Sequence, residues 1–77
     1  MGKDLLERIA KALVDDPDGV SINCIEGAKS TILELKVNDG DVGKIIGKQG
    51  RIAVAIRIIL NAALAKQKRR VILEILD

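Results

Sequence analysis

The sequence predicts an α+β domain in which a helix and two strands are followed by two helices and a third strand. Two segments repeat apolar residues at helical spacing, three short segments are typical of strands, and only brief connections join them. The 77 residues suffice for a single domain, which we place at residues 1–77. We therefore expect a three-stranded mixed sheet with its helices on one face.

The first two elements form an N-terminal extension. An amphipathic helix is expected over residues 3–15, where apolar residues recur at helical spacing and charged residues occupy the other side. It ends before Pro17, because the residue preceding a proline avoids the helical region, and Gly19 permits a turn. Residues 20–26 follow as a half-buried strand, since apolar and polar residues alternate there.

The remaining elements form the core, residues 30–77. Leu33, Leu35 and Val37 alternate with charged residues in a second strand, which the short preceding connector joins to the first as an antiparallel hairpin. A short helix from Val42 to Ile46 and a long helix over residues 50–66 come next. The last strand, residues 71–76, is rich in β-branched residues. Because a helical crossover precedes it, it should lie parallel to the second strand.

Charge is distributed unevenly along the chain, although the formal net charge is only +2. Residues 1–41 carry nine acidic and five basic side chains, whereas residues 42–73 carry eight basic side chains and no acidic one. One pole of the domain should therefore attract a polyanion. The alternative is a chance segregation of solvated charges.

The composition argues against several classes of protein. No apolar run approaches the ~18 residues that span a membrane, the acidic start differs from a secretory leader, and Cys24 is the single cysteine. We expect a cytoplasmic protein that does not bind membranes. Histidine is absent and the paired Asp15 and Asp16 have no partners with metal-ligand spacing, so we expect neither an enzyme nor a cofactor.

The most informative motif is the Gly-x-x-Gly of Gly47 and Gly50, which precedes the long apolar helix. By itself this spacing is weak evidence, because two glycines also permit a simple turn. Its surroundings are more specific. The loop carries Lys48 and Gln49, and the first turn of the next helix has free backbone N–H groups that bind anions. We interpret the motif as a phosphate-binding loop.

Two nucleotide-binding motifs do not fit this loop. A P-loop has four residues between its first glycine and its Gly-Lys pair, followed by a hydroxyl residue, whereas three residues separate Gly43 from Gly47 and Gln49 replaces the hydroxyl. A dinucleotide fingerprint needs a preceding strand, a Gly-x-Gly pair and a later acidic residue. None of these is present, so the sequence does not predict a mononucleotide or dinucleotide site.

Residues 45–50 resemble the signature of a KH domain, whose GXXG loop clamps the backbone of about four nucleotides of single-stranded RNA. The element order is similar to the type II arrangement. Residues 42–57, with Asp15–Pro17 upstream, resemble the small single-domain KhpA-type RNA-binding proteins of bacteria. The resemblance implies an RNA chaperone or post-transcriptional regulator that binds single-stranded RNA. It also implies homodimers, or pairing with a larger KhpB (Jag)-type KH protein.

The resemblance also implies which residues contact RNA. Within the loop, Lys48 would neutralise a phosphate and Gln49 would hydrogen-bond to the backbone. Lys44 and Arg51 flank the loop as further phosphate contacts, while other residues would line an apolar groove under the bases. The expected RNA-binding residues are Gly43, Lys44, Ile46, Gly47, Lys48, Gln49, Gly50, Arg51 and Val54.

The chain contains no Phe, Tyr or Trp. Stacking of bases on aromatic side chains, worth about 1–3 kcal/mol per base, is therefore not available. Binding should depend on phosphate contacts and aliphatic packing, with little sequence preference. Since no residue visibly reads a 2′-hydroxyl, single-stranded DNA is an alternative ligand.

The long helix carries more apolar residues than one sheet can cover. We expect the face of Ile52, Ile56, Ile59 and Ala63 to meet the sheet, which leaves a second apolar stripe exposed. Such a stripe is typical of an interaction surface. The expected dimer interface comprises Val54, Arg57, Ile58, Asn61, Ala62 and Ala65. Two alternatives are that the first helix covers the stripe, and that the chain is a protein-interaction module acting through residues 50–66.

Overall fold

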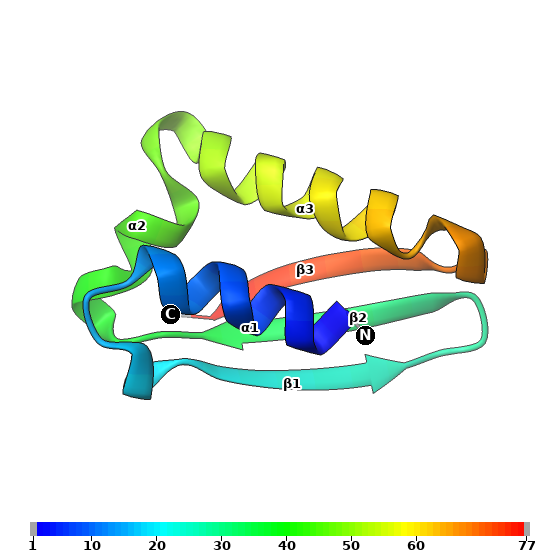
Figure 1. Cartoon of the computed structure of the whole chain (residues 1–77), viewed down its shortest axis with the longest axis horizontal. Coiled ribbons are helices and arrows are strands. Elements are labelled where there is room, and N and C mark those ends of the chain that lie inside the picture. The colour runs from blue at the N-terminus through cyan, green and yellow to red at the C-terminus, as the bar shows by residue number, and fades with distance from the viewer. Residues whose placement is uncertain (1, 77) are drawn as a thin grey trace.

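The computed structural model describes residues 2–76, so the two terminal residues of the predicted domain lie outside the described range. Its helices and strands are α1 (Gly2–Leu13), β1 (Ser21–Glu26), β2 (Ser30–Lys36), α2 (Val42–Ile46), α3 (Arg51–Ala63) and β3 (Arg70–Leu76), as Figure 1 shows. This order is the predicted one.

The three strands form one mixed sheet in the order β1-β2-β3. The hairpin partners β1 and β2 are antiparallel, with Cys24 opposite Leu33. The crossover through α2 and α3 brings β3 parallel to β2, with Leu33 opposite Leu73. The predicted mixed sheet and the direction of each pair are confirmed.

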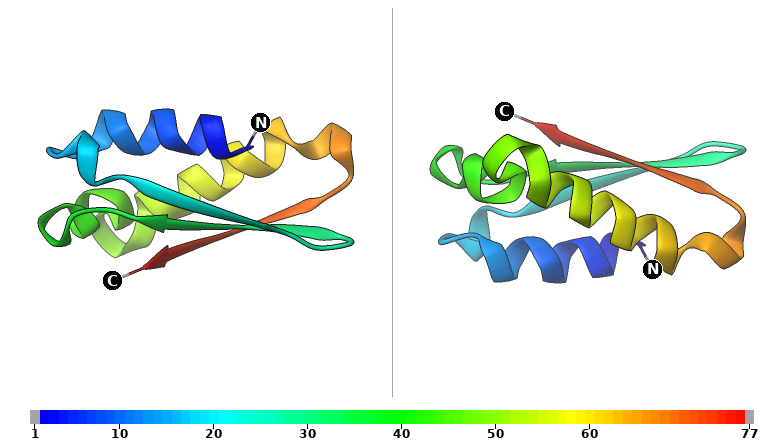
Figure 2. Two further views of the ribbon diagram at one scale, coloured as in Figure 1. Left: turned by 90° about the horizontal axis from the view of Figure 1, so that it is seen from below. Right: turned by 90° about the horizontal axis from the view of Figure 1, so that it is seen from above.

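One face of the sheet is covered and the other is open. Leu33 and Leu35 of β2 and Val71 and Leu73 of β3 point to the covered face, where each is buried. Figure 2 shows α1 and most of α3 on one side of the twisted sheet. On the open face Ile72 is 37% exposed. The helices therefore lie on one face, as the α+β prediction required.

The hydrophobic core joins all the elements except β1, which contributes only the half-buried Ile22. The other residues of β1 are exposed, because it is the edge strand, so the predicted half-buried strand is more open than expected. Ile45 of α2 is fully buried, which fixes the short helix that precedes the glycine loop. The core residues are Leu6, Ala10, Val14, Leu33, Leu35, Val37, Ile45, Ile56, Leu60, Leu64, Val71 and Leu73.

The first helix ends earlier than the sequence indicates, at Leu13. The amide N–H groups of Asp15 and Asp16 donate to the two carboxylate oxygens of Asp41, at 3.2 and 3.1 Å. Because these amides bind a distant side chain, they do not continue the helical hydrogen bonding. The helix boundary is thus decided by a contact between residues 26 positions apart in the chain.

The face of α3 that meets the core also differs from the prediction. Ile59 is 47% exposed and Ala63 is exposed, whereas Ile56, Leu60 and Leu64 are buried. The physical reason is that α3 packs against α1 as well as β3. Residues four apart lie on the same side of a helix, so Ile56, Leu60 and Leu64 form the stripe that faces α1 and β3. Ile59 lies outside this stripe.

Candidate nucleic-acid interface

The glycine loop is a tight, left-handed turn between α2 and α3. Gly47 has φ 74° and ψ 176°, a region open essentially to glycine alone, and its N–H donates to Gly43 O at 2.9 Å. Gln49 and Gly50 also have positive φ, 58° and 74°, before Arg51 returns to helical geometry. The N–H of Gly50 donates to Gly47 O at 3.1 Å, which closes the turn.

The two glycines serve different purposes. A Cβ at Gly47 would lie 2.5 Å from Cγ1 of Ile52, so the first turn of α3 occupies that space. A Cβ at Gly50 would meet nothing within 4 Å. Gly47 is required by the packing of the protein itself, whereas Gly50 leaves an open surface beside the start of α3.

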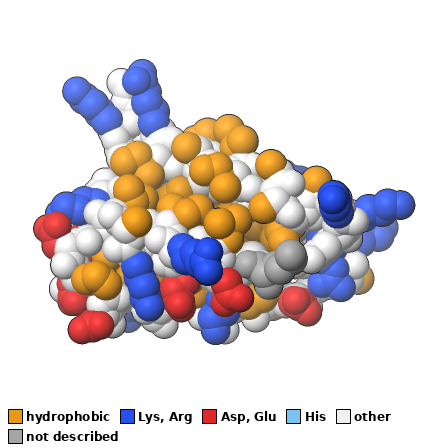
Figure 3. Space-filling model, in the orientation of Figure 1, with side chains coloured by type: hydrophobic (Ala, Val, Ile, Leu, Met, Phe, Trp, Pro, Cys, Tyr) orange, Lys and Arg blue, Asp and Glu red, His pale blue; other side chains and the backbone are white. Residues whose placement is uncertain are grey.

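The polar side chains of the loop point to solvent. Lys48, Gln49 and Arg51 are all exposed, and Arg51 donates a hydrogen bond of 3.3 Å to the Gln49 side chain. Figure 3 shows Lys and Arg side chains projecting from this end of the molecule. Among the described residues neither Lys48 nor Arg51 lies within ion-pair distance of an acidic side chain. Their charges are therefore available to an external anion.

Lys44 is in a different position from Lys48. Its ammonium lies 2.9 Å from Asp15 and 3.5 Å from Asp41, so it is engaged by two carboxylates within the chain. The hydrogen bond and charge of Asp15, followed by those of Asp41, raise the pKa of Lys44 above 10.5. The structure thus places this predicted RNA-contacting residue in an internal cluster, although the side chain remains partly exposed.

Asp41 is the buried centre of that cluster, with only 3% of the residue exposed. Burial acts to raise its pKa, but the amide N–H groups of Asp15 and Asp16 and the ammonium of Lys44 outweigh this, and the pKa is lowered from 3.8. Asp41 therefore links the end of α1 to the start of α2. The local sequence does not indicate this link, because it joins residues 25 and 26 positions apart.

The remaining predicted RNA-binding residues lie on the two helices beside the loop. Gly43 has open space at its Cβ position, Ile46 is 36% exposed and Val54 is 48% exposed. All three are therefore accessible to a ligand held at the loop. An apolar surface of this kind can pack against bases without reading their identity.

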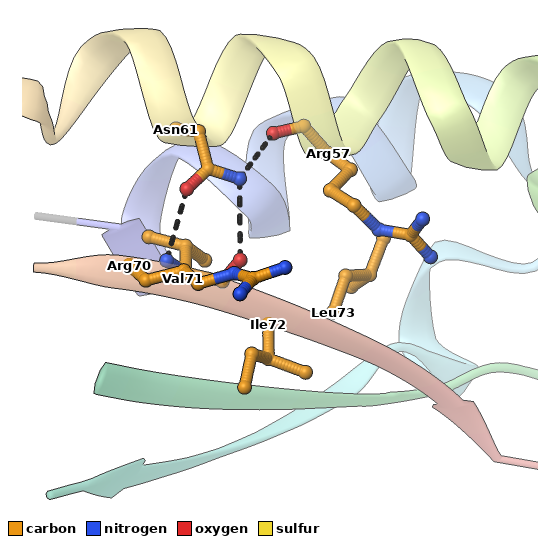
Figure 4. A pocket seen from close by; sticks show the side chains of 6 residues that line it. All are labelled: Arg57, Asn61, Arg70, Val71, Ile72 and Leu73. Atoms are coloured by element: carbon orange, nitrogen blue, oxygen red, sulfur yellow. Dashed lines mark hydrogen bonds between the residues drawn. The ribbon is translucent and has the colours of Figure 1, made fainter. Parts of the chain in front are cut away.

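A pocket of about 270 Å³ opens between α3 and the free edge of β3. It is lined by Arg57, Asn61, Arg70, Val71, Ile72 and Leu73, as Figure 4 shows. Two arginines thus lie at an accessible hollow whose walls are otherwise largely aliphatic. Arg70 was not among the predicted site residues. The acid-free stretch that contains both arginines was the signal that could have indicated it.

Asn61 connects α3 to β3 inside this pocket. Its Nδ2 donates to Arg57 O at 2.9 Å and to Val71 O at 3.2 Å, and its Oδ1 accepts from Val71 N at 3.0 Å. Figure 4 shows this arrangement. Because the amide is satisfied within the chain, it stabilises the edge of the sheet. Asn61 is half-buried, and its side-chain amide already has hydrogen-bond partners within the chain.

The exposed side of α3 carries the predicted apolar stripe. Val54 is 48% exposed and Ile58 is 64% exposed, and Ala62 and Ala65 are exposed as well. Ile59 adds to the same surface. Hydrophobic side chains gather over α3 in Figure 3. The first helix therefore leaves this stripe uncovered, and we call Val54, Ile58, Ile59, Ala62 and Ala65 the α3 stripe.

Within residues 2–76, no group of three His, Cys, Asp or Glu side chains is placed to hold a metal ion. None of the helices described is both long and apolar enough to cross a membrane. The site therefore consists of a cationic glycine loop, an exposed aliphatic surface beside it and a pocket with two arginines. The cations of Lys48, Arg51, Arg57 and Arg70 are suited to binding a polyanion.

An α-β-β-α-α-β domain with a GXXG loop between its second and third helices is a KH domain of the type II order. Comparison with known families narrows this class. The family model described as "KhpA/KhpB, KH domain" matches residues 3–75, and the chain belongs to this family. The comparison with solved structures found no match.

Several relatives are similar over nearly their whole length. The chain is 64% identical over 74 residues to "RNA-binding protein KhpA" of Borreliella burgdorferi, which covers 96% of this chain and 90% of that protein. It is 59% identical to the protein of that name from Caldanaerobacter subterraneus subsp. tengcongensis, covering 95% and 97%. Identity to the Treponema pallidum protein of that name is 46%, covering 100% and 96%. These names agree with the expectation of a non-enzymatic protein.

Proposed function

We propose that this chain binds single-stranded RNA through its GXXG loop and acts as an RNA chaperone or post-transcriptional regulator. The observation that carries the proposal is the loop, where Lys48 and Arg51 flank left-handed backbone beside the open surface of Gly50 and have no ion-pair partner within residues 2–76. The names of the relatives support RNA as the ligand.

Binding rests on the RNA backbone, with low sequence specificity. The chain has no aromatic side chain to stack on a base, so affinity comes from phosphate contacts and from aliphatic packing at Ile46 and Val54. Each phosphate neutralised on a single strand adds about 0.7 to the slope of log affinity against log salt. A lone domain should therefore bind modestly and with clear salt dependence.

The double variant Lys48→Asp/Gln49→Asp tests the proposal. Titration of a fluorescent RNA of about eight nucleotides should show binding by the native chain and its loss in the variant. The control Lys3→Asp/Ser21→Asp makes the same change in charge at exposed sites on α1 and β1, and should bind like the native chain. Equal binding by all three proteins, with unchanged circular dichroism, would refute the loop as the RNA site.

Two other readings predict different results in the same titration. If single-stranded DNA is the preferred ligand, the DNA version of the oligonucleotide binds more tightly than the RNA. If the chain is a protein-interaction module, the native chain binds neither nucleic acid. A nucleic acid is favoured because predicted anion-binding groups surround the loop, which a module acting only through the α3 stripe does not need. The names of the relatives favour RNA over DNA.

The α3 stripe is the proposed interface of a homodimer, or of a heterodimer with a larger KhpB (Jag)-type KH protein. Its four predicted apolar members, Val54, Ile58, Ala62 and Ala65, are all exposed, which supports this part of the proposal. Arg57 remains the candidate polar contact, whereas Asn61 acts by holding β3 beside α3. A dimer would join two modest RNA sites and raise their combined affinity. We place the protein in the cytoplasm, where its proposed ligand is found.

A further inference from the structure

A second concentration of positive charge lies at the end of α3 opposite the glycine loop. A short turn at Ala65–Gln67 and left-handed backbone at Lys68, φ 55°, connect α3 to β3. The N–H of Arg70 then donates to Lys29 O at 3.2 Å, which brings the β1–β2 turn alongside. We call Lys29, Lys66, Lys68, Arg69 and Arg70 the distal basic patch. Figure 3 shows Lys and Arg side chains at this end of the molecule.

The charges of the distal basic patch are largely unpaired. Arg69 approaches Glu26 at 3.9 Å, with the Arg69 side chain partly exposed and the Glu26 side chain largely exposed, so this pair is weak. For the other four cations, no acidic side chain of the described residues lies within ion-pair distance. Five cations thus face one carboxylate, which leaves a strongly positive surface.

Helix stability does not account for this arrangement. A cation in the last turn of a helix is favoured by the macrodipole, but the last turn of α3 contains no basic residue. Lys66, Lys68, Arg69 and Arg70 lie beyond the end of α3, and Lys29 belongs to another turn. Clustering like charges from separate elements is unfavourable for the folded chain alone. An external polyanion would remove that repulsion.

The pocket between α3 and β3 adjoins the patch. Arg70 belongs both to the distal basic patch and to the pocket wall, where Arg57 also lies. From Arg51 to Ala63 the helical rise corresponds to about 18 Å, and residues 42–73 contain no acidic side chain. Cations therefore occur near both ends of α3 and at the pocket beside it.

We infer that the distal basic patch is a second phosphate-binding site for the same nucleic-acid strand that the loop holds. This inference rests on the proposed function. The strand passes from the loop across the pocket, where Arg70 attracts its backbone, and its far end binds Lys66 and Lys68. A strand of about four nucleotides, the length that a GXXG loop clamps, occupies only the loop end, whereas a longer strand engages both sites.

The experiment compares two RNA lengths and two charge-matched variants. Single-stranded RNAs of about four and about twelve nucleotides are titrated with the native chain, with Lys66→Gln/Lys68→Asn, and with the control Lys11→Gln/Lys36→Gln. Asn suits position 68 because it tolerates left-handed backbone. Both control lysines are exposed. Lys36 lies opposite Leu76, at the other end of the sheet from Arg70, and Lys11 lies in the last turn of α1. Circular dichroism and thermal unfolding verify that each protein is folded.

We expect the native chain to bind the longer RNA more tightly and with a steeper salt dependence. The patch variant should lose about tenfold in affinity for the longer RNA and about 1.4 of its salt slope. Its affinity for the shorter RNA and the behaviour of the control should not change. Equal losses in patch variant and control, or equal loss for both RNA lengths, would overturn the inference. If the native chain binds neither RNA, the proposed function itself fails.

Discussion

Gly47 lies directly against the side chain of Ile52, and a Cβ at Gly47 would stand 2.5 Å from its Cγ1. This contact sets the distance between the end of α2 and the first turn of α3. It therefore determines the shape of the loop that separates them. The polar residues at the loop tip, Lys48 and Gln49, are held outward because this pair closes the base of the turn.

The two loop glycines should respond differently to substitution. Gly47→Ala combines a clash with Ile52 and backbone strain, so we expect a loss of about 3 kcal/mol in the free energy of unfolding. Gly50→Ala meets open space and suffers only left-handed strain, about 1 kcal/mol. Urea unfolding measures both. In RNA titrations, Gly50→Ala should nevertheless bind weakly, because its methyl group occupies the surface that the ligand backbone needs. Equal stability of the two variants would contradict the packing role of Gly47.

The Asp41 cluster should set the pH limits of stability. Since the folded-state pKa of Asp41 is lowered from 3.8, its contribution is present above that value and lost as the pH falls through the lower folded-state pKa. The pKa of Lys44 is raised, so its contribution is present below 10.5 and lost as the pH rises through the folded-state pKa. Asp41→Asn should lower the urea midpoint at neutral pH. It should also flatten the midpoint's dependence on pH between about pH 5 and pH 2. If the urea midpoint of this variant falls in acid as steeply as that of the native chain, Asp41 is not the source of the acid dependence.

Substitutions at Lys44 and Lys48 should have different effects, the first on stability and the second on RNA binding. Lys48→Gln removes an unpaired charge and should reduce the salt slope of RNA affinity by about 0.7, with little effect on unfolding. Lys44→Gln breaks two ion pairs and should lower the unfolding midpoint while leaving the salt slope unchanged. Titrations at several salt concentrations and thermal unfolding provide both readings. A reduced slope in Lys44→Gln would instead make Lys44 a direct phosphate contact.

The amide of Asn61 should matter for the stability of β3. Asn61→Ala leaves the N–H and the C=O of the buried Val71 without their partner, so we expect a loss of about 2 kcal/mol. Asn23→Ala is the matched control, because Asn23 donates only to the exposed side chain of Glu34, and it should cost less than about 0.5 kcal/mol. Hydrogen exchange at Val71 should rise only in the first variant. Similar losses of stability in the two variants would argue against a role of Asn61 in holding β3 beside α3.

The α3 stripe should determine whether the protein is a dimer in solution. Ile58→Asp places a charge at the most exposed apolar position of the helix, and the dimer dissociation constant should rise by about a hundredfold or more. Ile25→Asp, at a 46% exposed position on the open sheet face, is the control and should remain dimeric. Light scattering of the three proteins measures this. A monomeric native chain would eliminate the proposed dimer.

The amino-acid sequence by itself determined the element order, the pairing of the strands and the place of the GXXG loop. These depend on local periodicity, on short connections and on the handedness of a crossover, all of which act over neighbouring residues. The KH resemblance of residues 45–50 could be seen for the same reason, because the loop is contiguous.

Only the tertiary structure decided which side chains remain available to a ligand. Lys44 and Lys48 look equivalent in the sequence, yet Asp15 and Asp41 engage the first and leave the second free. Asn61, a predicted interface residue, hydrogen-bonds to the backbone of Val71. Packing of α3 against α1 as well as β3 leaves Ile59 exposed. Each of these outcomes depends on contacts between residues far apart in the chain, whose distances are set by packing and not by local spacing.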